Sequence, residues 1–197
     1  LDMMKKNAPA LIVRIFLLVL IWPVLPGCSI HGSFQGLYSY YHKTRDAAPS
    51  LIKKPVLPLC DLVPLDMPVV YVVNGAELKN CIQHFEKSLV YIWRPKCSSE
   101  VCIPPMNIQT FCRTRHIELF VVAEYYDFPT MNLVYPMERP VFGIDCEHYS
   151  TNLTKKYVPM FLSDLALETP APEDHYFFLF EYGCLKNSAH RLENLGI

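Results

Sequence analysis

The chain has 197 residues, of which 51% are hydrophobic, and this is enough for one domain with a substantial core. The formal net charge is −1 and the Lys and Arg residues are scattered, so the composition argues against a nucleic-acid partner. An aromatic content of 13% argues against a disordered chain.

The N-terminus has the pattern of a secretion signal. Its first part is positively charged through Lys5, Lys6 and Arg14. Residues 15–25 then form an apolar run that is interrupted by Pro23 and is too short to span a bilayer as a helix. The run ends in Leu-Pro-Gly-Cys at residues 25–28, so the segment predicts cleavage and export rather than a membrane-spanning helix.

Residues 25–28 resemble the lipobox of bacterial lipoproteins, although Pro26 departs from the commoner pattern. The resemblance implies a signal peptide over 1–27, with Cys28 as the lipidated mature N-terminus. Ser29 after that cysteine implies outer-membrane sorting and a protein that faces the periplasm. We therefore expect a membrane-lipid partner and an oxidising compartment that permits disulfides. The alternative is an ordinary secretory signal with a chance cysteine.

Residues 28–68 predict a tether and an extended lead-in to the folded domain. The part up to residue 49 is polar and aromatic. Four prolines then disfavour a helix in the remainder, at Pro55, Pro58, Pro64 and Pro68.

From residue 69 the hydrophobic pattern alternates between strands and helices. We expect a strand at 69–73, a turn at Asn74-Gly75, an amphipathic helix at 76–87 and a buried strand at 89–93. Pro104-Pro105 predict the start of a helix that runs to about residue 115. The next expected elements are a strand at 117–125, a loop with one helical turn at 127–140 and a strand at 141–144.

The last third of the chain predicts one helix and a hairpin. Ser150 or Thr151 is expected to cap a helix that runs to Leu165, and Pro159 is expected to kink or split it. After a loop at 168–174 we expect a strand at 176–180, a turn at Tyr182-Gly183, a returning strand at 184–189 and a short helix at 191–197. This order predicts an α/β domain with a mixed sheet and helices on both faces.

The strand Val90-Tyr91-Ile92-Trp93 is followed by Arg94-Pro95-Lys96-Cys97. This arrangement resembles envelope thioredoxin-like proteins, in which a strand ending in Phe-Trp is closely followed by the reactive cysteine. The resemblance implies a thioredoxin-like domain over 69–197, with Cys97 as the attacking thiol and Trp93 as a supporting residue. Lys96, Arg94 and a nearby helix start are expected to favour the thiolate.

Two positions depart from that family's pattern. Glu100 stands where the second cysteine is usual, so the partner in this chain is Cys102. On a regular helix, residues five apart are separated by roughly 8 Å or more, whereas a disulfide needs Cα atoms within about 7 Å. A Cys97–Cys102 bond therefore requires a loop. His175 aligns with the usual proline that faces the reactive cysteine, and it is a candidate partner for Cys97.

The segment from Pro95 to Cys102 is also similar to the Cys-x4-Cys segment of one atypical peroxiredoxin class. In that class a Thr or Ser precedes the first cysteine at the position that Arg94 occupies here. This second resemblance implies a thiol peroxidase in which both cysteines react.

Five further cysteines remain, at Cys60, Cys81, Cys112, Cys146 and Cys184. Cys60–Cys81 and Cys146–Cys184 are both candidate structural bridges, and the spacing does not choose between them. Cys112 has the position of a core thiol on a helix. No C-x2-C pair is present, so we expect neither a zinc site nor another cofactor.

Two functional hypotheses follow. The first is a lipid-anchored envelope protein that exchanges thiols and disulfides with a protein partner through Cys97, with Cys102 resolving, either as an oxidoreductase or as a thiol peroxidase. The second is a non-catalytic lipoprotein that uses the same fold as a binding or structural module, with a structural Cys97–Cys102 disulfide.

Overall fold

The computed structural model describes residues 36–133, 137–165 and 174–197. The predicted signal peptide at 1–27, the lipidation site at Cys28 and the first part of the tether lie outside these ranges. The described residues belong to one compact unit, Phe34–Ile197. Within them, no helix has both the length and the apolar character needed to cross a membrane.

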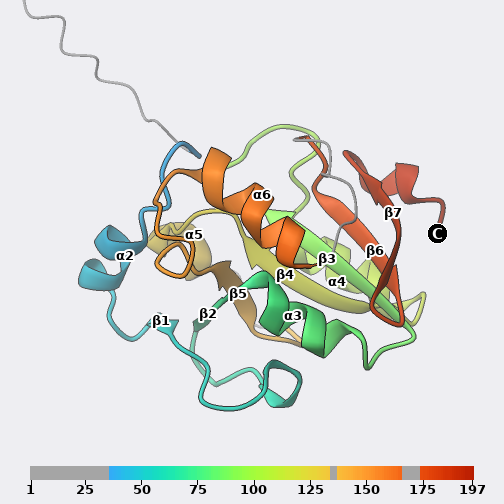
Figure 1. Ribbon diagram of the computed structural model, residues 1–197, viewed down its shortest axis with the longest axis horizontal. Coiled ribbons are helices and arrows are strands. Elements are labelled where there is room, and N and C mark those ends of the chain that lie inside the picture. Colours follow the sequence, from blue (N-terminus) through green and yellow to red (C-terminus); the bar gives the residue numbers. More distant parts are fainter. Residues whose placement is uncertain (1–35, 134–136, 166–173) are drawn as a thin grey trace, which may run out of the picture. The chain divides into compact units, whose positions relative to one another are not determined.

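The unit is built on a seven-stranded sheet with the order β1-β2-β5-β4-β3-β6-β7 (Figure 1). The first five strands in this order run parallel, β6 is antiparallel to β3, and β7 is antiparallel to β6. In chain order the strands are β1 Ile52–Lys53, β2 Val70–Val73, β3 Lys87–Trp93, β4 Glu118–Ala123, β5 Val141–Ile144, β6 Phe177–Glu181 and β7 Cys184–Ala189.

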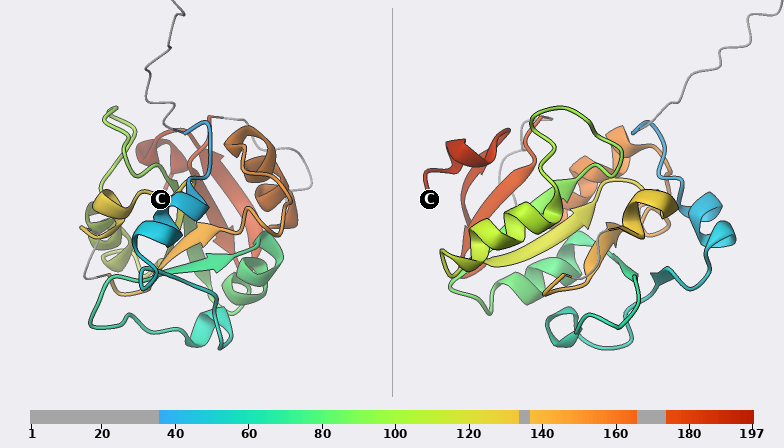
Figure 2. Two further views of the ribbon diagram at one scale, coloured as in Figure 1. Left: turned by 90° about the vertical axis from the view of Figure 1, so that its left-hand side faces the viewer. Right: turned by 180° about the vertical axis from the view of Figure 1, so that it is seen from behind.

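Helices cover both faces of this sheet. Helix α3 (Gly75–Ile82) packs with α6 (Thr154–Asp164) on one face, and α4 (Pro105–Arg113) covers the other (Figures 1 and 2). Two shorter helices are α2 (Tyr41–Ala47) and α5 (Phe128–Met131), and 3-10 turns occur at Leu59–Asp61 and Leu192–Leu195. The predicted α/β architecture with a mixed sheet is confirmed.

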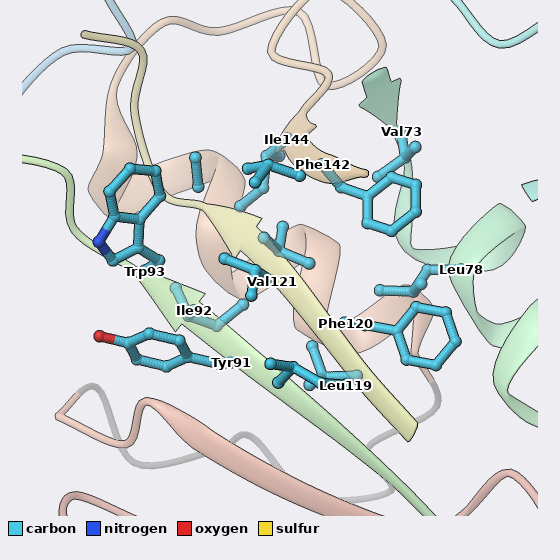
Figure 3. Close-up of a cluster of buried hydrophobic side chains, with 14 of the residues drawn as sticks. Val73, Leu78, Tyr91, Ile92, Trp93, Leu119, Phe120, Val121, Phe142 and Ile144 are labelled. Atoms are coloured by element: carbon cyan, nitrogen blue, oxygen red, sulfur yellow. The ribbon is translucent and has the colours of Figure 1, made fainter. Parts of the chain in front are cut away.

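Strands β2 and β5 are buried along their whole length, and β3 and β4 at every residue but the first, because helices screen both faces of the sheet. Figure 3 shows how Val73, Leu78, Phe120 and Phe142 from β2, α3, β4 and β5 meet in the core. Continuous apolar runs of this kind predicted these strands correctly, because a strand that is buried on both faces does not alternate apolar with polar residues.

Local chemistry explains where α3 begins and why it differs from the prediction. The Asn74 side chain accepts a hydrogen bond from the backbone N–H of Glu77, and the Glu77 carboxylate accepts one from the Asn74 N–H. Asn74 is therefore the N-cap residue of a capping box and Gly75 is the first residue of the helix, so the pair does not form a separate turn. The expected helix over 76–87 was too long, because Lys87 already belongs to β3.

Helix α6 differs from the prediction at its start and is not split. The helix begins at Thr154 rather than after Ser150 or Thr151, and Ser150 has a left-handed backbone with φ of 53°. Pro159 lies within one continuous helix and does not split it. Pro159 has no N–H to donate to the Lys155 carbonyl, and both residues are exposed.

The lead-in is more structured than the proline content suggested. It contributes helix α2, with Tyr41 packed edge-on to Tyr126 at 5.2 Å between ring centroids, and the edge strand β1. A disulfide joins Cys60 to Cys81 on α3, with Cα atoms 5.3 Å apart. The described part of 28–68 therefore packs into the same unit as residues 69–197.

The C-terminal hairpin follows the prediction. Tyr182 and Gly183 have positive φ values of 48° and 76°. The favoured two-residue hairpin turns use positive φ because their twist then matches the twist of the two strands. This turn returns the chain so that β7 pairs with β6, and the predicted short C-terminal helix is the 3-10 turn at Leu192–Leu195.

Candidate redox site

The candidate site lies beyond the carboxyl ends of the central parallel strands. Strand β3 ends at Trp93 beside Ala123, the last residue of β4, and the Glu124 N–H continues the pairing to the Trp93 carbonyl at 2.8 Å. The loops after β3 and β4 therefore leave the sheet side by side. In open α/β sheets this edge is where ligands generally bind.

Residues 94–104 form a loop between β3 and α4, and this loop carries the disulfide Cys97–Cys102. The Cα atoms of the two cysteines are 5.8 Å apart, within the range that a disulfide needs. Both cysteines are half-buried. The structure thus meets the condition set by the sequence, since the helix starts only at Pro105 and leaves the segment free to bend.

The Ser99 hydroxyl contacts both sulfurs of the disulfide. Its Oγ is 3.1 Å from Cys97 Sγ and 3.4 Å from Cys102 Sγ. A disulfide sulfur carries no hydrogen, so the Ser99 hydroxyl is the donor and the sulfurs are weak acceptors. The sequence pattern did not single out this residue.

Arg94 is committed to a neighbouring carboxylate. Its Nε donates to Glu124 Oε2, and its guanidinium lies 4.5 Å from the ring centroid of Tyr176. The Glu124 side chain is only 7% exposed. Burial raises the pKa of Glu124 above its usual value, although the hydrogen bond and charge of Arg94 act in the opposite direction. Arg94 therefore serves first to compensate a buried carboxylate.

Lys96 is paired in the same way. Its Nζ is 2.7 Å from Asp127 Oδ1, and its backbone N–H donates to the Tyr125 hydroxyl at 3.0 Å. Burial opposes ionisation of Asp127, but hydrogen bonds from Lys96 and Thr130 outweigh it and lower the pKa of that carboxyl. The positive charge of Lys96, which was predicted to act on Cys97, is thus partly balanced by the nearby Asp127 carboxylate.

Two further contacts hold the far side of the loop. The Tyr91 hydroxyl donates to the Ile103 carbonyl at 2.9 Å, immediately before α4. Glu100, which stands in place of the usual second cysteine, lies 3.5 Å from Arg191 in an exposed ion pair. The loop is therefore tied to β3, to the segment after β4 and to the segment after β7.

Trp93 and His175 are the remaining predicted site residues. Trp93 is buried at the end of β3 (Figure 3). His175 lies just before β6, where its Nδ1 is 2.9 Å from Ser188 Oγ of β7. Among the described residues no hydrogen bond or ion pair joins His175 to Cys97.

The other cysteines divide into bonded and free. Cys60–Cys81 forms, whereas the alternative bridge between Cys146 and Cys184 does not: Cys146 is buried and free, and Cys184 is exposed and free. Cys112 is a core thiol as predicted, and burial raises its pKa to about 12. The described residues contain no group of three or more His, Cys, Asp or Glu side chains that could hold a metal ion.

Glu124, Tyr125 and Asp127 are the site residues that the sequence pattern missed. A signal for them was present, because polar residues follow directly on the apolar strand 118–123. The register of β3 against β4 was needed to place them next to Arg94 and Lys96. No protein-family model, curated protein or solved structure matches this chain, so its own geometry carries the functional argument.

Proposed function

We propose that the protein exchanges thiols and disulfides with a protein partner, with Cys97 as the attacking residue and Cys102 as the resolving residue. The observation that carries this proposal is a half-buried disulfide at the carboxyl edge of the sheet, in the loop that follows the interior strand β3. A pair of cysteines in such a place is open to a partner, yet held at bonding distance.

The thioredoxin-like character of the domain is part of the same proposal. In support of it, β3 delivers Cys97 from the middle of a mixed sheet, with the parallel β4 on one side and the antiparallel β6–β7 hairpin on the other. Helix α4 follows the two cysteines, and helices cover both faces.

Each step of the exchange conserves atoms and electrons. The Cys97 thiolate attacks one sulfur of a substrate disulfide, and the other substrate sulfur leaves as a thiolate that takes up a proton. The Cys102 thiolate then attacks Cys97 Sγ, which releases the second substrate sulfur and closes the Cys97–Cys102 bond. Two electrons pass from the cysteine pair to the substrate, and the reverse sequence oxidises a substrate dithiol.

Replacing Cys97 with Ser should abolish the reduction of insulin disulfides, because the hydroxyl that remains does not attack a disulfide. Cys102→Ser should instead accumulate a mixed disulfide between Cys97 and the substrate, visible by mass spectrometry under non-reducing conditions. Cys184→Ser removes a free and exposed thiol outside the site and is the matched control, with activity expected to equal that of wild type.

Equal insulin reduction and equal peroxide consumption by wild type and Cys97→Ser would overturn the proposal and leave the structural disulfide of the non-catalytic hypothesis. Peroxide consumption is measured with the same variants. A Cys97-dependent loss confined to peroxide assigns the chemistry to a thiol peroxidase. There the Cys97 thiolate attacks one peroxide oxygen, the O–O bond breaks, and the other oxygen leaves as water or an alcohol. The Cys102 thiol then attacks the resulting Cys97 sulfenic acid, which releases water as the disulfide closes.

We also propose that the protein is anchored to the cell envelope through Cys28, facing an oxidising periplasm. The leader motif motivates the anchor, and two disulfides in the described unit are in keeping with such a compartment. In a Gram-negative host, radiolabelled palmitate should enter wild type and Cys184→Ser but not Cys28→Ala. An unlabelled wild type would contradict the anchor without affecting the redox proposal.

A further inference from the structure

The charges around Cys97 are already balanced by partners. Arg94 is paired with Glu124, Lys96 with Asp127, and Arg191 with Glu100. The Tyr125 hydroxyl accepts the Lys96 backbone N–H. Each cation in this set therefore has an acidic partner that offsets the positive charge it would offer to a thiolate at Cys97.

Ser99 is the polar side chain with the required geometry. Its hydroxyl lies within hydrogen-bonding distance of both sulfurs and is closer to Cys97 Sγ, at 3.1 Å, than to Cys102 Sγ, at 3.4 Å. The backbone N–H of Cys102 donates to the Ser99 carbonyl at 3.0 Å, which fixes Ser99 inside the turn between the cysteines. The hydroxyl can thus serve either sulfur without a change in the backbone.

We propose that Ser99 is a catalytic residue that donates its hydroxyl hydrogen bond to the Cys97 thiolate and, when Cys97 is the leaving sulfur, to the thiolate that forms there. This inference rests on the proposed function, since it describes how the same site ionises. It assigns the stabilising role to a neutral donor instead of the lysine and arginine beside the cysteine.

The expected effect follows from hydrogen-bond energetics. The pKa of the thiol depends on how much more strongly the hydroxyl binds the thiolate than the neutral thiol, and hydrogen bonds to charged groups are the stronger ones. Loss of the hydroxyl should therefore raise the pKa of the Cys97 thiol by about one unit. Because a more basic thiolate is also a better nucleophile, the alkylation rate at neutral pH should fall by only about threefold.

The test measures iodoacetamide alkylation of the mildly reduced full-length protein across pH, with each cysteine followed by peptide mass spectrometry. Ser99→Ala should move the midpoint of the Cys97 profile upward by about one pH unit, and Ser99→Thr, which keeps the hydroxyl, should restore it. Ser98→Ala changes an exposed neighbour and should leave the midpoint in place. Cys184 is the internal reference, because its rate should be the same in every variant.

The inference is overturned if Ser99→Ala keeps the wild-type midpoint, or if Ser98→Ala shifts it equally. Because alkylation needs no substrate, this outcome is separate from the fate of the proposed function. Cys97-dependent insulin reduction together with an unshifted Ser99→Ala profile removes the role of Ser99 and retains the exchange activity. A shifted profile together with unchanged activity in Cys97→Ser removes the exchange activity.

Discussion

Arg94→Met should destabilise the folded protein by about 3–5 kcal/mol at neutral pH, because it leaves a buried carboxylate without its partner. Glu124 is the group at risk, since its side chain is 7% exposed and its Oε2 accepts from Arg94 Nε. The substitution keeps most of the apolar stem of the side chain, so the loss is mainly electrostatic. Urea denaturation at a series of pH values measures it.

The pH dependence has a defined sign. Burial raises the pKa of Glu124 above 4.5 even with Arg94 present, and loss of Arg94 raises it further. A carboxyl with a raised folded-state pKa disfavours folding above that value and carries no such penalty below its unfolded value, where both states are protonated. The penalty in Arg94→Met should therefore be full at neutral pH and shrink as the pH falls toward the unfolded value.

Two companion variants isolate the cause. Adding Glu124→Gln to Arg94→Met removes the buried charge and should recover most of the lost stability. Arg113→Met is the matched control, because its ion pair with Glu138 is exposed on both sides, at 61% and 55%, and should cost less than about 1 kcal/mol. A loss in Arg94→Met no larger than this control, or one independent of pH, would show that Glu124 does not depend on Arg94.

The ion pair between Arg94 and Glu124 shows which contacts could not be predicted from the sequence. Apolar runs such as 89–93 and 141–144 predict buried strands because the side chains themselves determine the burial. The partners of Arg94 and Lys96 lie some thirty positions later, and only the alignment of β3 with β4 brings them together. The sequence next to Cys97 therefore predicted positive charges without partners, whereas the folded chain places acidic side chains beside both Arg94 and Lys96.

The misplaced start of α6 has a similar origin. Ser150 and Thr151 have the chemistry of helix caps, but the chain continues for several residues before the first helical turn. At that turn the Thr154 hydroxyl donates to the carbonyl of Gly36, a residue 118 positions earlier. A contact over such a distance leaves no local pattern. The loop geometry of Cys97–Cys102 was predictable, because Pro104-Pro105 delay the helix within the same segment.

Replacing both Cys60 and Cys81 with Ala should destabilise the protein by about 3 kcal/mol, because the bond closes a loop with a sequence separation of 21 residues. Cys97→Ala with Cys102→Ala opens a separation of only 5 residues and should cost less, about 2 kcal/mol by the same chain-entropy relation. Urea denaturation under non-reducing conditions ranks the two pairs. Limited proteolysis should cut the 54–68 lead-in faster only in the first variant, since that bond ties the lead-in to α3.

The two bonds should also differ in how readily they open. In the first pair only Cys60 is half-buried, because Cys81 is 3% exposed, whereas Cys97 and Cys102 are both half-buried in a surface loop. Exchange requires an incoming thiolate to reach a sulfur, so a mild dithiol should reduce Cys97–Cys102 first. A redox protein needs this order, because the bond that cycles must open while the bond that secures the lead-in stays closed. Simultaneous reduction of both bonds, or earlier opening of Cys60–Cys81, would argue that Cys97–Cys102 is the structural bond.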